Sequence, residues 1–382
     1  MTAAERRVQF GAHPVAYPLV RGLGLVYPVV RVPRVGVVVS DAAIARQVLS
    51  DPVSFTKTGP GSPADLWTPV VGPRVLLNME GAEHAELRRK LGGLFTARAV
   101  SSLCAEVAAA PMAFLSSELR AGRPVDVVSV VKDLAGAVIC ALVGLPSADR
   151  AELARAFAAG TAMTSMVRLG RPRLTPSQVA RCRSVLADLT APAVRAYADG
   201  DPSTVPGRMR ELGLTESEAL GAVAAFVLTG TETLVSYVPR LIALAIDTGW
   251  LARLSLDRTR LDDVVNEGLR FTVPSPVMLR SVARDAFVGG KRVKAGERVV
   301  IATISCAKTL GPFDPDRPHS PALRQLWFGA GAHFCLGMPL AYAEIRTVLE
   351  TLLGLDGLSI VERRVARRVL IPAYERLVVR CG

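Results

Sequence analysis

The sequence predicts a single, mainly α-helical domain with a small β-rich region. Stretches rich in Ala, Leu and Val repeat their apolar residues at the helical period, above all over residues 101–186, 215–247 and 338–353. β-Branched runs, which favour strands, are confined to short segments. No stretch has the composition of an interdomain linker, so we expect one domain that spans residues 1–382.

Residues 35–73 predict a strand, a helix and then a long loop. The β-branched run at 35–40 is typical of a strand, and Asp41 is placed to cap the helix that follows. Residues 52–73 are rich in Gly, Pro, Ser and Thr and include Trp67. We expect this stretch to be a surface loop, and long loops in compact domains are often functional.

Residues 79–91 predict a charged helix. His84 and Arg88 are four positions apart, so their side chains share one face of that helix. Taken by themselves, these residues fit a solvated surface helix. A cationic pair of this kind is also suited to binding carboxylates.

Residues 215–247 predict a helix that carries the most informative candidate functional residues. Within an apolar run, the segment places Thr229, Gly230, Glu232 and Thr233 close together. A mid-helix glycine costs roughly 1 kcal/mol relative to alanine, and a buried glutamate needs a partner. Such local violations tend to mark functional sites, although a kinked helix whose hydroxyls bond to carbonyls four residues earlier explains them equally well.

Three further segments carry recognisable patterns. Glu267 and Arg270 are three positions apart on a predicted helix, and most such pairs are exposed and contribute little. Residues 287–300 contain a pair of glycines between alternating residues and predict a hairpin. Residues 369–380 predict terminal strands around a turn near Tyr374.

The stretch from residue 328 to residue 340 is suited to holding a thiolate. A helix is predicted to begin at Met338, because Pro339 fits a first helical turn and apolar residues then recur at helical spacing. Cys335 precedes this helix, where amide N–H groups and the helix dipole stabilise an anionic sulfur and lower its pKa. The stretch also holds Gly329, Gly331 and Gly337. Glycines let the backbone pass close to something flat and bulky.

Composition favours a soluble cytoplasmic protein without membrane association. Hydrophobic residues make up 50% of the chain, which provides a large core and argues against disorder. No uninterrupted apolar run approaches the roughly 18 residues that span a bilayer, and the first residues make a poor signal peptide. The six cysteines lack the Cys-x-x-Cys spacing of zinc sites, which is consistent with a reducing compartment.

The net positive charge of the chain indicates a negatively charged binding partner. The formal net charge is +12, and arginines spread along the chain supply most of it. Because no motif combines basic and aromatic residues, we do not expect a nucleic-acid ligand. An acidic protein partner is the more economical explanation.

The pattern Phe-Gly-x-Gly-x-His-x-Cys-x-Gly at residues 328–337 resembles the haem-thiolate loop of cytochromes P450. Further segments resemble that family in the expected order: His84-x-x-x-Arg88, Gly230-x-Glu232-Thr233, Glu267-x-x-Arg270, Arg280, and a Phe-Asp-x-x-Arg element ending at Arg317. The resemblance covers nearly the whole chain. It implies the cytochrome P450 fold, a helical domain with a small β-rich region and a b-type haem buried between distal and proximal helices.

The resemblance implies a haem site around Cys335, which would be the axial ligand of the iron. Phe328 would shield the sulfur, and backbone N–H groups after the cysteine would hydrogen-bond to it. His84, Arg88, Arg280 and His333 would meet the haem propionates. The other implied cofactor contacts are Gly230, Gly329, Gly331 and Gly337.

The resemblance also implies the reaction and the partners. O2 would be activated with electrons from an acidic ferredoxin and its reductase. One oxygen atom would enter a small apolar molecule of secondary metabolism, by hydroxylation or epoxidation. Glu232 and Thr233 would organise the protons. The substrate pocket would be shaped by Trp67, Thr229, Val277 and Met278.

The family also implies a structural lock and a cover over the pocket. The lock, on the cysteine side of the haem, would consist of Glu267, Arg270 and Arg317. A helix pair near residues 148–200 would act as a lid, and the protein would be a monomer. Thr229 and Leu234 depart from the family pattern, as do residues 307–312 in place of an Asn-Arg-Asp-Pro run.

Three rival functions make different predictions. A peroxide-driven haem enzyme usually lacks the acid and the alcohol of the distal helix, whereas Glu232 and Thr233 are both present. A haem-based sensor predicts no substrate turnover with any reductase. A basic nucleic-acid binder predicts salt-dependent retention on DNA and a colourless protein.

Overall fold

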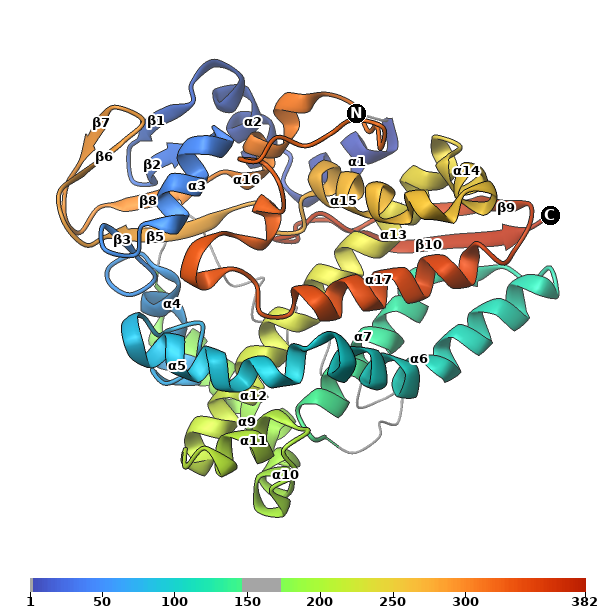
Figure 1. The fold of residues 1–382 in the computed structure, drawn as a ribbon. Coiled ribbons are helices and arrows are strands. Elements are labelled where there is room, and N and C mark those ends of the chain that lie inside the picture. The colour runs from blue at the N-terminus through green and yellow to red at the C-terminus, as the bar shows by residue number, and fades with distance from the viewer. Residues whose placement is uncertain (1–2, 146–172) are drawn as a thin grey trace.

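The computed structural model describes residues 3–145 and 173–382. It confirms the predicted class, a large helical region with a smaller β-rich region beside it (Figure 1). The helix pair predicted near residues 148–200 falls partly outside the described residues. Its described part consists of α9 (Pro176–Thr190) and α10 (Ala193–Asp199).

The centre of the helical region is formed by five helices that pack against one another: α6 (Ala97–Arg120), α7 (Val127–Leu142), α12 (Glu216–Gly230), α13 (Glu232–Asp247) and α17 (Met338–Leu352). The other helices are α1 (Ala3–Ala12), α2 (Ala16–Val26), α3 (Ala42–Ser50), α4 (Pro63–Val71), α5 (Gly81–Leu91), α11 (Val205–Glu211), α14 (Trp250–Leu256), α15 (Leu261–Thr272) and α16 (Thr303–Cys306). Apolar residues at helical spacing explain this packing. On α13, for example, all residues from Leu234 to Ala245 are buried.

The described strands form three sheets. The largest has the order β1 (Val29–Val32), β2 (Gly36–Val39), β8 (Arg298–Ile301), β5 (Met278–Val282) and β3 (Phe55–Thr56). A second sheet has the order β4 (Val125–Asp126), β10 (Tyr374–Cys381) and β9 (Leu358–Val365). The predicted hairpin is present as β6 (Ala286–Val288) and β7 (Lys291–Val293), joined by Gly289 and Gly290 at positive φ.

Two predictions about local structure were wrong. The predicted loop at 52–73 contains α4, because Ser62 caps Asp65 N–H, Pro63 fits the first turn, and Trp67 is only 8% exposed. The terminal strands begin earlier than predicted, since Tyr374 pairs with Val365 and the turn between β9 and β10 is residues 366–373. Both corrections bring additional residues to the site described below.

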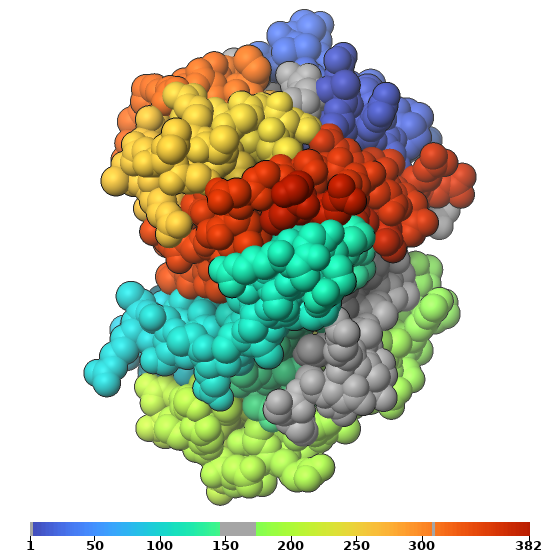
Figure 2. Space-filling view, turned by 90° about the vertical axis from the view of Figure 1, so that its right-hand side faces the viewer, coloured from blue at the N-terminus to red at the C-terminus, as the bar shows by residue number. Residues whose placement is uncertain are grey.

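By length and composition alone, α6 and the α12–α13 pair could each cross a membrane. This is weak support for a span, because core helices of soluble proteins have the same properties. Over its most apolar stretch, the α12–α13 pair is 56% buried inside the protein. Helix α6 lies at the surface in Figure 2, where it is teal, and packs inward against α7 and α17.

Candidate active site

A cavity of about 570 Å³ is lined both by the break between α12 and α13 and by the cysteine-containing stretch. Its wall is mostly apolar. All residues predicted to ligate iron, bind the cofactor, act in catalysis or shape the substrate pocket line this cavity, with the exception of Gly331. Tertiary packing therefore assembles in one chamber residues that lie in widely separated parts of the sequence.

The cysteine-containing loop is held in a fixed shape. The Cys335 N–H donates to the Phe328 carbonyl at 2.9 Å, and Phe334 N–H donates to the Gly331 carbonyl at 3.1 Å. Gly331 has φ +66°, and a Cβ there would lie 2.6 Å from the carbonyl oxygen of Leu49 on α3. Gly331 therefore acts on the side away from the cavity, by allowing the loop to approach α3.

Cys335 exposes its surface to the cavity, directly before α17 begins at Met338 as predicted. The prediction of a lowered pKa was wrong for the protein alone. Burial raises the pKa of Cys335, and this outweighs the lowering by the amides of Gly337 and Met338 and by Arg88. A stable thiolate at this position therefore requires additional positive charge on the sulfur.

Five basic side chains line the cavity near the cysteine: Lys57, His84, Arg88, Arg280 and His333. Their positive charges are costly here. Burial and Arg280 lower the pKa of Lys57 to about 7, burial and His333 lower that of His84 to about 4, and burial lowers that of Arg280 to about 10. An anionic group bound among them would reverse these shifts. Lys57 was not singled out from the sequence, since it stands alone in a polar stretch without helical register.

Glu80 is the carboxylate nearest to this basic group. Burial raises its pKa, but hydrogen bonds from His333, the Lys57 amide and Thr56 outweigh burial and hold the pKa at about 2. His333 Nε2 lies 2.7 Å from Glu80 Oε2, so this ring nitrogen pairs with Glu80. The family resemblance implied a propionate as the partner of His333, and no sequence motif pointed to Glu80.

A helix break forms another part of the cavity wall. The α12–α13 segment was predicted as one helix with a possible kink, and it is interrupted at Thr231. Thr229 and Thr231 donate to the carbonyls of Ala225 and Val227, at 2.8 and 3.2 Å. These are the predicted bonds from a hydroxyl to the carbonyl four residues earlier, and Thr229 also lines the cavity.

Glu232 and Thr233 are the first two residues of α13, and both line the cavity. A helix N-terminus favours a carboxylate at this position. Gly230 packs closely on α7, because a Cβ there would lie 2.4 Å from Ile139 Cδ1 and the Ile139 side chain would have to shift. The break thus presents an acid and an alcohol to the chamber.

Glu344 on α17 also lines the cavity. It is 5% exposed, and burial raises its pKa well above the ordinary value, so the carboxyl is held neutral. The sequence contains a signal for this residue. Glu344 lies four positions from both Leu340 and Val348, hence on the apolar face of the helix.

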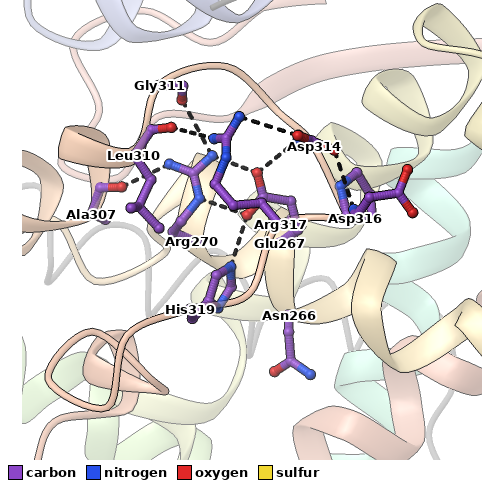
Figure 3. A network of polar contacts seen from close by, with 12 residues as sticks. Asn266, Glu267, Arg270, Ala307, Leu310, Gly311, Asp314, Asp316, Arg317 and His319 are labelled. Atoms are coloured by element: carbon purple, nitrogen blue, oxygen red, sulfur yellow. Dashed lines mark hydrogen bonds and ion pairs between the residues drawn. The ribbon is translucent and has the colours of Figure 1, made fainter.

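Glu267 and Arg270 of α15 form a buried ion pair (Figure 3). Glu267 and Arg270 are 1% and 0% exposed, and two bonds of 2.5 and 2.6 Å join them. Arg270 also donates to the carbonyls of Ala307, Gly311 and Pro312. The irregular 307–312 segment therefore serves to surround this guanidinium with acceptors.

The third member of this lock differs from the predicted one. His319 Nε2 lies 2.8 Å from Glu267 Oε2, whereas Arg317 bonds to Asp314 and to the carbonyls of Leu310 and Pro312 (Figure 3). Arg317 supports Glu267 indirectly, because the Asp314 N–H donates to Glu267 Oε1 at 2.8 Å. The Phe-Asp-x-x-Arg pattern thus predicted the loop that bonds to Glu267 correctly, but the side chain in that loop is His319 and not Arg317.

Replacing His319 should therefore destabilise the protein more than replacing Arg317. His319→Ala should lower the free energy of unfolding by about 1–3 kcal/mol, because a buried carboxylate loses a partner. Arg317→Ala should cost less than about 1 kcal/mol, since its ion pair is partly exposed. Urea unfolding followed by circular dichroism measures both. His319→Gln, which can still donate, should recover part of the loss, and a larger effect of Arg317→Ala would contradict this assignment.

Comparisons with known proteins agree with this geometry. The Cytochrome P450 family model matches residues 257–355. The chain is 30% identical over 287 residues to the mycinamicin IV hydroxylase/epoxidase of Micromonospora griseorubida, an alignment that covers 73% of this chain and 71% of the relative. It is 28% identical over 337 residues to the cyclomarin C epoxidase CymV of Salinispora arenicola, covering 80% of each chain.

The fold is similar to that of solved P450 structures. A mutant of P450 EryK in complex with erythromycin B superposes with a TM-score of 0.83 at 24% identity, covering 97% of each chain. The chain belongs to the cytochrome P450 family of monooxygenases.

Proposed function

We propose that the chain binds a b-type haem in the 570 Å³ cavity and uses it to transfer one oxygen atom from O2 to a small apolar molecule. The observation that carries this proposal is the position of Cys335. Its thiol lines the chamber just before α17, and the acid and alcohol at the start of α13 line the same chamber. These are the groups that a haem-thiolate monooxygenase requires on the two sides of its cofactor.

The chamber fits haem on two independent grounds. Its five basic side chains match a group that carries two carboxylates, and their lowered pKa values indicate an unsatisfied need for negative charge. The cysteine needs a cation to become a thiolate, and coordination to a metal ion deprotonates a thiol outright. The described residues contain no group of three His, Cys, Asp or Glu that would hold a metal on its own. The sequence also lacks a Cys-x-x-Cys-His motif for covalent attachment, which favours haem b.

The chain's own residues have distinct tasks in this proposal. When bound, the haem iron supplies the binding and reductive activation of O2. Cys335 would ligate the iron, and the amides of Gly337 and Met338 would hydrogen-bond to the sulfur. The Thr233 hydroxyl and the Glu232 carboxyl would hold water at the helix break and pass protons into the chamber. Trp67, Val277 and Met278 would exclude bulk water and contact an apolar substrate.

The relatives support a role in secondary metabolism. The names of the mycinamicin and cyclomarin enzymes describe hydroxylation or epoxidation of natural products. The largely apolar wall of the chamber suits an apolar substrate of that kind. We propose that this chain, as a soluble cytoplasmic monomer, performs a hydroxylation or an epoxidation on such a molecule.

Replacing the cysteine tests the proposed ligand. The ferrous CO complex should show the red-shifted Soret band of thiolate ligation, and Cys335→Ser should lose it. Cys140→Ser and Cys306→Ser are matched controls, since both sulfurs are buried elsewhere and neither lines the cavity. The band should survive in both controls. Its survival in Cys335→Ser would refute the assignment.

The proposed electron donor is an acidic ferredoxin that docks on the cysteine side. Arg46 and exposed Arg324 border this side, where Arg46 Nε donates to the Ala322 carbonyl at 2.9 Å. Attraction between opposite charges weakens as salt shortens the Debye length, about 10 Å at 0.1 M.

Turnover with an acidic ferredoxin should therefore fall as salt rises, while peroxide-driven turnover changes much less. Charge reversal at Arg324, by Arg324→Glu, should reduce ferredoxin-supported turnover several-fold, or about 1 kcal/mol of encounter energy. Arg195→Glu, at an exposed position on α10, is the control and should have little effect. Equal salt sensitivity of the two reactions would reject the docking proposal.

Removing the Thr233 hydroxyl should uncouple electron use from product formation. Thr233→Ala should retain fold and haem content, because alanine is the better helix former, while product per NAD(P)H falls and hydrogen peroxide appears. Thr231→Ala is the control, since that hydroxyl bonds to the Val227 carbonyl and does not line the cavity. Simultaneous measurement of NAD(P)H, product and peroxide decides the matter. Unchanged coupling in Thr233→Ala would remove the residue from the catalytic set.

A further inference from the structure

Two irregular loops form part of the cavity wall. The first, residues 273–277, contributes Pro274, Ser275 and Val277, and the second, residues 366–373, contributes Leu370 and Ile371. Neither loop has regular backbone pairing along its whole length, so other contacts must fix its shape.

Arg240 joins the two loops. Its side chain extends from α13, about two helical turns beyond Thr233, and is 0% exposed. Nη2 donates to the carbonyl of Thr272, the residue before the first loop, at 2.8 Å. Nη1 donates to the carbonyl of Pro372, within the second loop and next to Ile371, at 3.0 Å. A guanidinium is planar and its donors point in fixed directions, so these two bonds set the spacing of the loops.

Glu5 of α1 neutralises this buried charge. Arg240 Nε donates to Glu5 Oε2 at 3.1 Å, and Arg240 Nη2 bonds to Oε1. Gln9 Nε2 also donates to Oε1, at 2.8 Å. Glu5 is 2% exposed, so the pair is removed from water. A buried guanidinium without a counter-ion would be strongly unfavourable, which makes the position of Arg240 dependent on α1.

Tyr17 of α2 provides a second connection. Its hydroxyl donates to the carbonyl of Leu370 at 2.8 Å. Burial raises the pKa of Tyr17, so the phenol stays protonated and remains a donor. The N-terminal helices thus contact the second loop directly through Tyr17 and indirectly through Glu5 and Arg240.

We propose that Arg240 is a positioning residue for the substrate side of the cavity, and that Glu5 and Tyr17 make the N-terminal helices part of the specificity determinant. The inference rests on the proposed function, because that function assigns the two loops to the substrate. Arg240, Glu5 and Tyr17 do not line the cavity. They act by holding the carbonyl groups of residues that border it or lie within its wall.

The test uses the haem-loaded protein and two nitrogen ligands of haem iron. Imidazole is small, binds at the iron and does not need the loops. Econazole carries bulky aromatic groups that must fit against the surrounding wall. Spectral titration gives the Kd of each ligand for the wild type, Tyr17→Phe, Arg240→Lys and Glu5→Gln.

Arg363→Gln is the matched control. Arg363 lies on β9 and pairs with Asp247 at the end of the same helix α13, and it also bonds to Tyr374, the residue after the second loop. Its loss removes an ion pair between β9 and α13, while the bonds of Arg240 and Tyr17 to the loops remain.

In Tyr17→Phe and Arg240→Lys, the Kd of econazole should rise about fivefold to tenfold, the equivalent of a lost buried hydrogen bond. The Kd of imidazole should stay within about twofold, since it reports only on the iron. Backbone amides of residues 366–373 should exchange faster with deuterium in both variants. Arg363→Gln should change neither Kd.

The outcomes separate the two proposals. Failure of imidazole to bind would overturn the haem proposal. Normal imidazole binding with unchanged econazole affinity in Tyr17→Phe and Arg240→Lys would overturn the positioning role and leave the haem proposal standing. Tyr17→Phe loses a single oxygen atom, so it provides a decisive result even if Glu5→Gln fails to fold. Equal weakening of both ligands in every variant would indicate a merely structural role.

Discussion

The geometry of the site depends on the burial of the Glu267–Arg270 ion pair. Two charges removed from water are tolerated only if every remaining donor and acceptor finds a partner. Arg270 therefore draws the 307–312 segment around itself, and Glu267 accepts from His319 and from the Asp314 amide. His319 in turn packs edge-on against Trp327, the residue before Phe328. A chain of contacts thus runs from the buried pair through His319 and Trp327 to the start of the cysteine loop.

Electrostatics of the chamber explain why this site needs a cofactor to be complete. Lys57, His84 and Arg280 lie in one wall, and burial disfavours their charged forms. Burial also disfavours the thiolate of Cys335. A cation bound to the sulfur and carboxylates bound to the basic groups would reverse both effects. A ligand that relieves such costs stabilises the folded protein by mass action, so fold and cofactor are expected to be tightly coupled.

Helix α13 combines two functions along its length. Its first residues, Glu232 and Thr233, line the cavity where the break at Thr231 exposes the helix end. Further along, Arg240 holds the loops that border the same cavity. Since a helix is stiff over this distance, the proposed proton path and the proposed substrate wall share one rigid support. Changes in the packing of α1 against Arg240 would therefore be transmitted to the pocket without any contact with substrate.

The amino-acid sequence by itself determined the elements whose signals are local. Cap residues and the helical period predicted α3 and α17, residue pairs at helical spacing indicated α5 and α15, and the paired glycines predicted the β6–β7 hairpin. The motif residues identified the thiol, the acid and the alcohol of the cavity wall and all but one of its basic side chains, because each motif is short and its spacing follows from a single helix or loop.

Tertiary structure decided what depends on contacts between distant segments. Burial raises the pKa of Cys335, opposite to the predicted direction. Folding places His319 against Glu267, whereas Arg317 bonds to Asp314. The apolar side chains of residues 63–71 pack in the core, so this segment forms a helix where the sequence predicted a loop. The residues that interact with Lys57 and Arg240 are far away in the sequence. A local sequence pattern therefore could not predict the roles of these two residues.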